Sequence, residues 1–310
     1  MAYVVGLLVS GTCSARCVYP VTAALPPGYS QVEILLTGWH TENLGGSTPL
    51  QQLTLGTRPV AYDPVTGHLA WEAIADIRHA AGSGDEYRFT LYFSIILTKL
   101  AGARLRVFQN HCSSAGGGEC HSGKILPHPN FPGWDVLAIG IRGFTLEAGT
   151  AGGLLLSRLG LKTSYLIPPG TSDVVSSLRC TMQDVTPTEP ITCRAELVGV
   201  IAAPGEGFAV HFSSRHYGLQ FLSLPAHENP PALPVDGAFG GLEAFSLSFG
   251  TSDEAKTWSL AADYNDILLC PDDVNFCYNR FGFLGDTFGA PGNVLKFLVE
   301  LAGFGIWTRP

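Results

Sequence analysis

Short apolar runs separated by turn residues fill almost the whole chain. Val, Ile, Leu and Phe dominate the runs, and 37 glycines and 21 prolines are spread between them. In the segment 68–77 every second position is apolar, which would place Leu69, Trp71, Ala73 and Ala75 on one face of a strand. This spacing is typical of strands that are buried on one side. The sequence therefore predicts an all-β chain.

The clearest predicted strands are Tyr3–Val9, 31–37, a run that begins at Leu50, 68–77, 88–97, Val174–Cys180 and Cys193–Ile201. Residues 98–131 contain three consecutive glycines and are expected to form a connection or a long loop. Pro204–Gly207 and Asn229–Pro234 are predicted linkers or loops. Residues 293–301 fit either a short helix or a last strand.

One pattern occurs twice, at a spacing of 105 residues. Gly28, an apolar run and Gly38-Trp39 correspond to Gly133, a second apolar run and Gly143-Phe144. Units of this length with several short strands predict tandem β-sandwiches of jelly-roll, Ig-like or H-type-lectin-like form, with long loops. The expected units are 1–105, 106–203 as a repeat of the first, and 204–310 as a C-terminal β unit, for which a degenerate third repeat is one interpretation.

Residues 36–90 also contain the pattern Leu-Thr-Gly-Trp-His…Tyr-Asp-Pro-x-Thr-Gly-x-Leu-x-Trp…Asp-Glu-Tyr-x-Phe-Thr. This pattern is similar to that of small β-sandwich modules such as the H-type lectins. The resemblance covers less than a third of the chain and includes no diagnostic motif. It implies a fold of this kind, and it assigns no lectin site residues.

The net charge is −8, and no run of Lys or Arg is present. Proteins that bind nucleic acids need a basic surface to meet the phosphates, so we expect no direct contact with nucleic acid. Charged residues make up only 14% of the chain. This fits a large, well-packed β protein or a subunit that buries surface against copies of itself. No apolar run reaches the roughly 18 residues of a membrane span, so no transmembrane segment is expected.

The eight cysteines form four pairs of sequence neighbours. Neighbouring pairs favour disulfides and an oxidising location, either extracellular or on the surface of a particle. Buried thiols in a reducing compartment are the alternative. The cluster His111, Cys112, Cys120 and His121 could also hold zinc, which accepts these ligand types. The pairs are Cys13 and Cys17, Cys112 and Cys120, Cys180 and Cys193, and Cys270 and Cys277.

Oxygen-bearing side chains are concentrated in residues 263–273. Calcium binds several such oxygens on a loop, so this segment is a candidate calcium site, while acidic residues in β-turns usually just face water. Its candidate ligands are Asp263, Asn265, Asp266, Asp272 and Asp273. No other cofactor is expected, and the chain contains none of the nucleophile-elbow, phosphate-loop or metalloprotease motifs of common enzymes. The sequence therefore predicts a protein that is not an enzyme.

Two functions follow from these observations as hypotheses. The first is a self-assembling structural protein, a β subunit of a coat, capsid, shell or extracellular filament whose partners are copies of itself. Low charge, high apolar content and the missing catalytic motifs favour it. The alternative is a carbohydrate-binding, lectin-like surface module whose partners are glycans.

Overall fold

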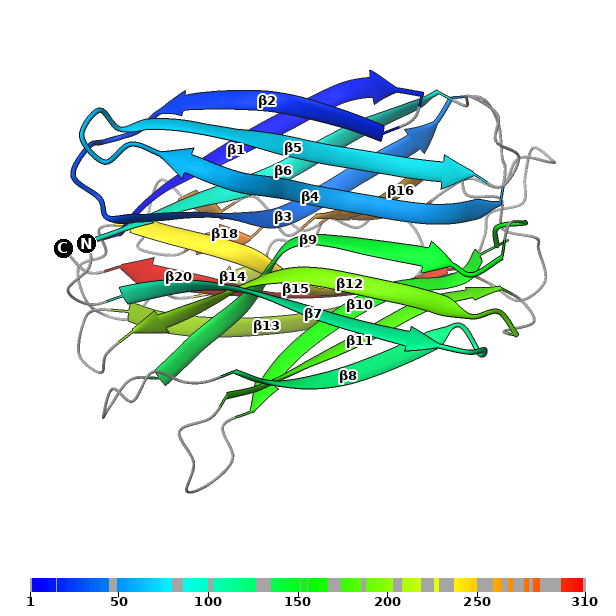
Figure 1. Ribbon diagram of the computed structural model, residues 1–310. Coiled ribbons are helices and arrows are strands. Elements are labelled where there is room, and N and C mark those ends of the chain that lie inside the picture. Colours follow the sequence, from blue (N-terminus) through cyan, green and yellow to red (C-terminus); the bar gives the residue numbers. More distant parts are fainter. Residues whose placement is uncertain are drawn as a thin grey trace.

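The computed structural model describes residues 2–14, 16–44, 49–79, 86–99, 103–126, 135–150, 152–154, 156–166, 174–184, 188–202, 208–218, 226–228, 237–249, 259–263, 267–269, 276–278, 281–284 and 297–308. Every helix or strand within these residues is a β-strand (Figure 1), so the predicted all-β, sandwich-like fold class is confirmed. The same residues include no helix that could span a membrane.

Three large antiparallel sheets and one small sheet contain these strands. Sheet A has the order β1 (Ala2–Cys13), β6 (Tyr87–Thr98), β3 (Gln31–Asn43), β16 (Ser259–Asp263) and β19 (Phe281–Leu284). Sheet B has the order β2 (Arg16–Ala24), β5 (His68–His79), β4 (Leu50–Tyr62), β9 (Asp135–Ala148), β12 (Ile191–Ala202) and β7 (Ala103–Ser114). Sheet C has the order β13 (Phe208–Gly218), β20 (Phe297–Thr308), β15 (Gly237–Phe249), β10 (Leu156–Leu166), β11 (Val174–Asp184) and β8 (Glu119–Leu126). The small sheet has the order β14 (Ala226–Glu228), β18 (Phe276–Tyr278) and β17 (Ile267–Leu269).

One local prediction needs correction, and one open alternative is decided. Residues 98–131 are not a long loop, because they include β7 of sheet B and β8 of sheet C, and the short turn between these strands contains Gly117 and Gly118, both with positive φ. The glycines form a tight turn and do not mark a long connection. Near the C-terminus the strand alternative holds, since β20 covers residues 297–308. The predicted linkers at 204–207 and 229–234 lie outside the described residues.

Each large sheet joins strands from distant parts of the sequence. Strand β4 pairs with β9 in sheet B, β10 pairs with β15 in sheet C, and β16 pairs with β3 in sheet A. Sheet A thus contains strands from the first and last thirds of the chain. Sheet B contains strands from the first and second thirds, and sheet C contains strands from the second and last thirds. Each third of the chain therefore contributes strands to two of the three large sheets.

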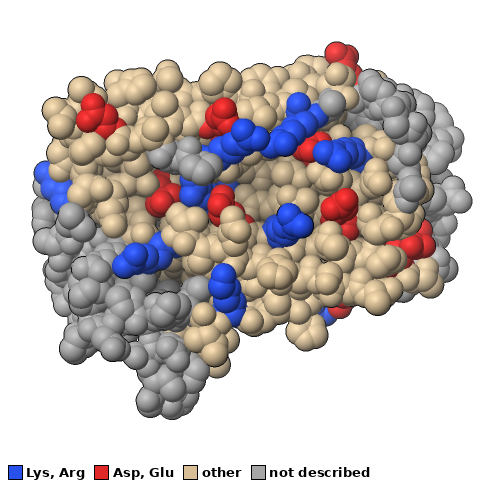
Figure 2. Space-filling model, viewed as in Figure 1, with Lys and Arg blue, Asp and Glu red and all other residues tan. Residues whose placement is uncertain are grey.

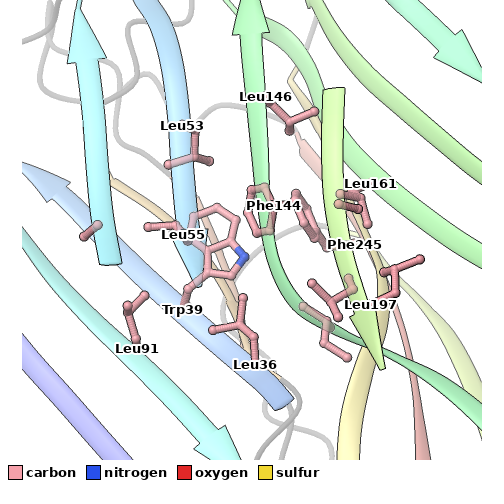
Figure 3. Close-up of a cluster of buried hydrophobic side chains, with 14 of the residues drawn as sticks. Leu36, Trp39, Leu53, Leu55, Leu91, Phe144, Leu146, Leu161, Leu197 and Phe245 are labelled. Carbon is pink, nitrogen blue, oxygen red and sulfur yellow. The ribbon is translucent and has the colours of Figure 1, made fainter. Parts of the chain in front are cut away.

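The main core is one continuous cluster that includes residues from all three sheets. At its centre, Trp39 on β3, Phe144 on β9 and Phe245 on β15 contact one another (Figure 3), with ring centroids 5.2 to 6.3 Å apart. All three rings are buried. Large aromatic side chains bury much apolar area, so this cluster contributes strongly to stability. Leu35, Ile96, Leu105, Ala138, Val198 and Val200 form a second, smaller cluster.

The three central strands share an irregularity next to these rings. The register of β3 shifts between Leu36 and Gly38, that of β9 between Ile141 and Gly143, and that of β15 between Leu242 and Ala244. Each shift leaves one extra residue, as in a β-bulge. The extra residues are Thr37, Arg142 and Glu243, and each lies two positions before the central aromatic residue.

Three of the predicted cysteine pairs are disulfides: Cys13 with Cys17, Cys112 with Cys120, and Cys180 with Cys193. The first joins β1 to β2, and the other two connect strands of sheet B to strands of sheet C. Cys270, a member of the fourth predicted pair, lies outside the described residues. That pair therefore stays a prediction.

Candidate binding groove on sheet B

The outer face of sheet B contains a groove where β4 and β9 separate. The two strands pair only from Gln52 to Leu55 with Glu147 to Phe144. Beyond this short ladder the strands diverge, and the groove opens between them with a volume of about 490 Å³. A second cavity of about 300 Å³ shares Thr54, Thr145 and Arg194 with it. Spaces of this size accommodate small ligands.

Two glycines form the floor of the groove. In the next row of the sheet after Thr54 and Thr145, Gly56 on β4 lies against the backbone of Gly143 on β9. A Cβ atom on Gly56 would lie 2.4 Å from the Cα of Gly143, so no side chain fits between the strands at this point. The missing side chains create the depression. Ile74 on β5 and Glu196 on β12 stand on its two sides.

Polar side chains border this floor because alternate residues of each strand point outward. The register across β5, β4, β9, β12 and β7 places five polar residues in one row, namely Asp76, Thr54, Thr145, Arg194 and His111. Within the row the hydroxyl of Thr54 donates to Oγ1 of Thr145 over 3.0 Å. Figure 2 shows basic and acidic side chains interspersed across the middle of this face.

Asp76, the acidic residue of the row, accepts hydrogen bonds from neighbouring side chains. The buried carboxylate of Asp76 accepts hydrogen bonds from both Nε and Nη2 of Arg78, at 3.2 and 3.1 Å. Nε2 of Gln52 donates to the same carboxylate over 3.3 Å. These contacts satisfy the buried charge. The hydrogen bond with Asp76 in turn raises the pKa of Arg78.

A buried arginine contacts two of the residues that line the groove, Thr57 and Glu196. Arg142, the extra residue of the β9 bulge, donates from Nε to Oγ1 of Thr57 over 3.0 Å and so bridges the diverging strands. Its guanidinium also forms ion pairs with Glu33 at 3.4 Å and Glu196 at 3.7 Å. Burial raises the pKa of Glu33, and the nearby Arg142 lowers it only partly. The cluster therefore ties β3 of sheet A to β9 and β12.

The opposite wall presents polar groups that have no partner within the described part of the chain. Within the described residues, neither the imidazole of His111 nor the guanidinium of Arg194 makes a hydrogen bond or an ion pair. Both side chains are exposed and face each other in register on β7 and β12. Gln109 lies beside them and donates to Glu196 over 3.4 Å. This wall can therefore donate hydrogen bonds to a ligand.

The sequence-predicted metal sites have different outcomes. Of the five calcium candidates, Asp263 ends β16 and its side chain is not described, whereas Asn265, Asp266, Asp272 and Asp273 lie outside the described residues. Calcium therefore stays a prediction. In the predicted zinc cluster, Cys112 and Cys120 are bonded to each other and buried, but His111 and His121 are exposed. Alternation along β7 and β8 directs imidazoles and thiols to opposite faces.

Sequence reasoning did not find the groove. Its only sequence signal is Gly143, which closes the second copy of the 105-residue pattern, and nothing in the sequence pairs this residue with Gly56.

No model of a known protein family matches the chain, and a search of curated proteins also finds no match.

Proposed function

We propose that this protein is a non-enzymatic binding protein and that the groove on sheet B binds a carbohydrate. The observation that carries the proposal is a depression floored by two glycines and bordered by polar side chains, of which His111 and Arg194 have no partner among the described residues. Sugars present many hydroxyl groups, which planar polar side chains such as Arg, Gln and Glu recognise by hydrogen bonds.

Several observations support binding over catalysis. The acidic residues at the groove are already engaged: Asp76 by Arg78 and Gln52, and Glu196 by Gln109 and Arg142. Catalysis by two carboxylates would need a separate acid and base that are free to exchange protons. The groove instead offers hydrogen-bond donors in a fixed frame. The disulfides are typical of an oxidising environment, and we propose an extracellular or particle-surface location.

A glycan array tests this function. Labelled protein should bind a defined set of neutral or acidic glycans, and replacing both His111 and Arg194 by Ala should reduce that signal by at least about tenfold, the equivalent of roughly 1.4 kcal/mol. Arg179→Ala is the matched control, because Arg179 is exposed on sheet C and pairs with Glu119. Equal binding by the groove variant and the control would refute the groove as the site.

A self-assembling structural subunit is the second candidate, and a row of apolar residues on sheet C favours it. The register places Leu166, Val175 and Ile125 side by side on β10, β11 and β8. Leu166 and Ile125 are 61% and 63% exposed. Light scattering of concentrated protein tests this candidate. A coat or filament subunit should form large particles that Ile125→Asp disperses, and a monomer in both cases would exclude this role.

We also propose that residues 1–105, 106–203 and 204–310 are three copies of one unit. The strand order β1-β6-β3 recurs as β7-β12-β9 and as β13-β20-β15. The bulge before each central aromatic residue recurs in all three. Random strand pairing would not give the same order and the same irregularity three times. Expression of 1–105 alone, followed by a folding assay, would show whether one unit is stable without its neighbours.

A further inference from the structure

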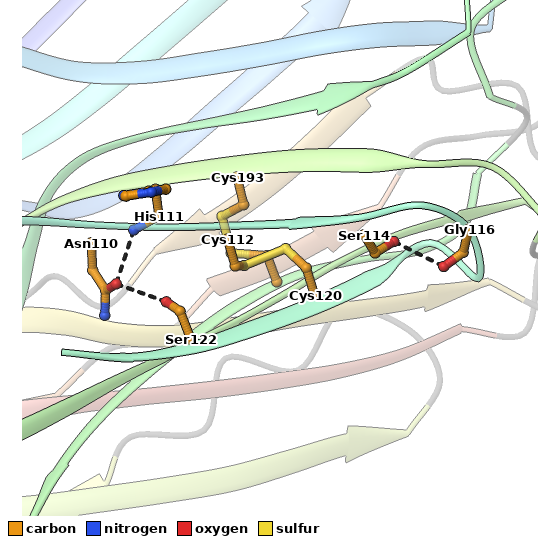
Figure 4. The surroundings of a disulfide bond; sticks show 9 residues. Asn110, His111, Cys112, Ser114, Gly116, Cys120, Ser122 and Cys193 are labelled. Carbon is orange, nitrogen blue, oxygen red and sulfur yellow. Dashed lines mark hydrogen bonds between the residues drawn. A yellow bond between two sulfur atoms is a disulfide. The ribbon is translucent and has the colours of Figure 1, made fainter.

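Four cysteines lie in one layer between sheets B and C. Cys112 and Cys193 are register partners on β7 and β12, and Cys120 and Cys180 are register partners on β8 and β11. The two disulfides of this layer, Cys112 to Cys120 and Cys180 to Cys193, each join sheet B to sheet C. Figure 4 shows the Cys112 to Cys120 bond with Cys193 close to it. All four side chains are buried.

The spacing of the sulfur atoms is close to that of a metal centre. The Sγ atoms of Cys112, Cys180 and Cys193 all lie within 4.8 Å of one another, and Sγ of Cys120 is bonded to that of Cys112. Zinc binds four thiolates tetrahedrally at about 2.3 Å, which separates the sulfurs by roughly 3.8 Å. Once reduction has broken the two S–S bonds, rotation of the side chains about Cα–Cβ must bring the four sulfurs to that spacing.

We propose that these four cysteines bind one Zn²⁺ ion when their disulfides are reduced. Each disulfide takes two electrons and two protons from a dithiol, whose own two sulfurs become a disulfide, and the reaction leaves four protein thiols. Zinc then displaces the four thiol protons and forms four Zn–S bonds. Sheets B and C stay connected in both chemical states, by two disulfides in one and by a zinc ion in the other.

The residues next to the cysteines in sequence fit this role. A basic residue directly adjoins each cysteine in sequence: His111, His121, Arg179 and Arg194. All four are exposed on the outer faces of the two sheets, behind the buried sulfurs. A zinc ion with four thiolates has a net charge of −2, and nearby cations favour thiolates over thiols. The zinc ligands in this proposal are the four sulfur atoms.

The first third of the chain provides an internal comparison. Cys13 has Tyr87 as its register partner, and Cys17 has Ala75. Tyr87 and Ala75 take the positions that Cys193 and Cys180 have in the layer between sheets B and C. The Tyr87 hydroxyl donates to the carbonyl oxygen of Ala75 over 2.9 Å, so an aromatic side chain occupies the place of the second sulfur pair. Among the residues that the structure describes, the Cys13 and Cys17 layer therefore offers two thiols.

Zinc retention after reduction tests the proposal. The parent protein has Cys270→Ser and Cys277→Ser, which removes the fourth cysteine pair from the measurement. It is reduced with a phosphine without oxygen, incubated with zinc chloride and desalted. We expect one zinc ion per chain, also after Cys13→Ser and Cys17→Ser, and none after Cys180→Ser and Cys193→Ser. Cobalt in place of zinc should give the absorption of a tetrahedral thiolate complex.

Two results would overturn the proposal. One is a reduced parent that retains no zinc, and the other is equal retention when Cys180 and Cys193 are replaced. If that variant does not fold, the thermal unfolding of the reduced parent decides the matter. Zinc bound only by the folded chain must raise its unfolding temperature. An unchanged temperature would contradict a buried zinc centre.

Discussion

Gly56 on β4 and Gly143 on β9 lie so close together that a Cβ atom on Gly56 would come within 2.4 Å of the Cα of Gly143. Gly56 also has a φ of 151°, a conformation that L side chains rarely adopt. The two glycines come directly after the short β4–β9 ladder, where the groove begins. These two glycines thus allow the strands to meet and leave the floor of the groove bare.

Replacing Gly56 by Ala should therefore destabilise the protein by roughly 1–3 kcal/mol, the usual range for forcing extra atoms into a packed site. Urea unfolding followed by circular dichroism measures this. Gly123→Ala is the matched control, because a Cβ atom there would meet nothing within 4 Å. Equal midpoints for the two variants would show that β4 and β9 do not touch as described.

Trp39→Ala should cost about 3–5 kcal/mol, as expected when a large buried aromatic side chain is truncated. Its ring contacts those of Phe144 and Phe245, which come from the other two large sheets, so the cavity would lie where all three sheets meet. Val65→Ala, at a side chain that is 82% exposed, should change the free energy of unfolding very little. A small loss for Trp39→Ala would contradict the shared core.

Arg142→Met should destabilise the protein by roughly 3 kcal/mol, because Glu33 and Glu196 would lose their buried cationic partner. Adding Glu33→Gln should recover part of this loss, since the second change removes an unpaired buried charge. A double-mutant cycle based on thermal unfolding measures the coupling between the two residues. Strictly additive effects would mean that the two side chains do not interact.

The stability of the protein should depend on the protonation of Glu243. Burial raises the pKa of this carboxyl from 4.5 to about 8. The folded chain therefore keeps a proton that the unfolded chain releases at lower pH, and the stability linked to it is full below about pH 4.5 and is lost as the pH rises towards 8.

Glu243→Gln, which stays neutral at all pH values, should remove this dependence. The variant should gain stability relative to the parent as the pH is raised through that interval, as measured by urea unfolding at several pH values. The raised pKa of Glu33 is present in both proteins and cancels in the comparison. A difference that stays constant with pH would show that Glu243 is ionised in the folded chain.

The local character of the strands could be predicted from the sequence. Alternation in 68–77 gave the buried face of β5, on which Leu69, Trp71, Ala73 and Ala75 all lie. Strand β7 was missed because it is rich in polar residues and because its turn contains the glycines 116–118. A cluster of glycines occurs both in tight turns and in long loops. Only the pairing of β7 with β12 shows that this cluster lies in a tight turn.

The candidate sites depend on pairings between distant residues, which local patterns do not specify. Gly56 and Gly143 meet only because β4 pairs with β9. The cysteines of β7, β8, β11 and β12 were paired correctly from their proximity in sequence. Their arrangement as a group of four depends on the register of β8 with β11 and of β7 with β12.

Carbohydrate binding through the groove on sheet B is the central claim, and titration of ¹⁵N-labelled protein by NMR tests it most directly. The ligand is the glycan that gives the strongest array signal. We predict chemical-shift changes concentrated at Thr54, Gly56, Gly143, Thr145 and Arg194, and their loss in the variant that lacks His111 and Arg194. Changes confined to sheet C, or no binding by any glycan on the array, would contradict the claim.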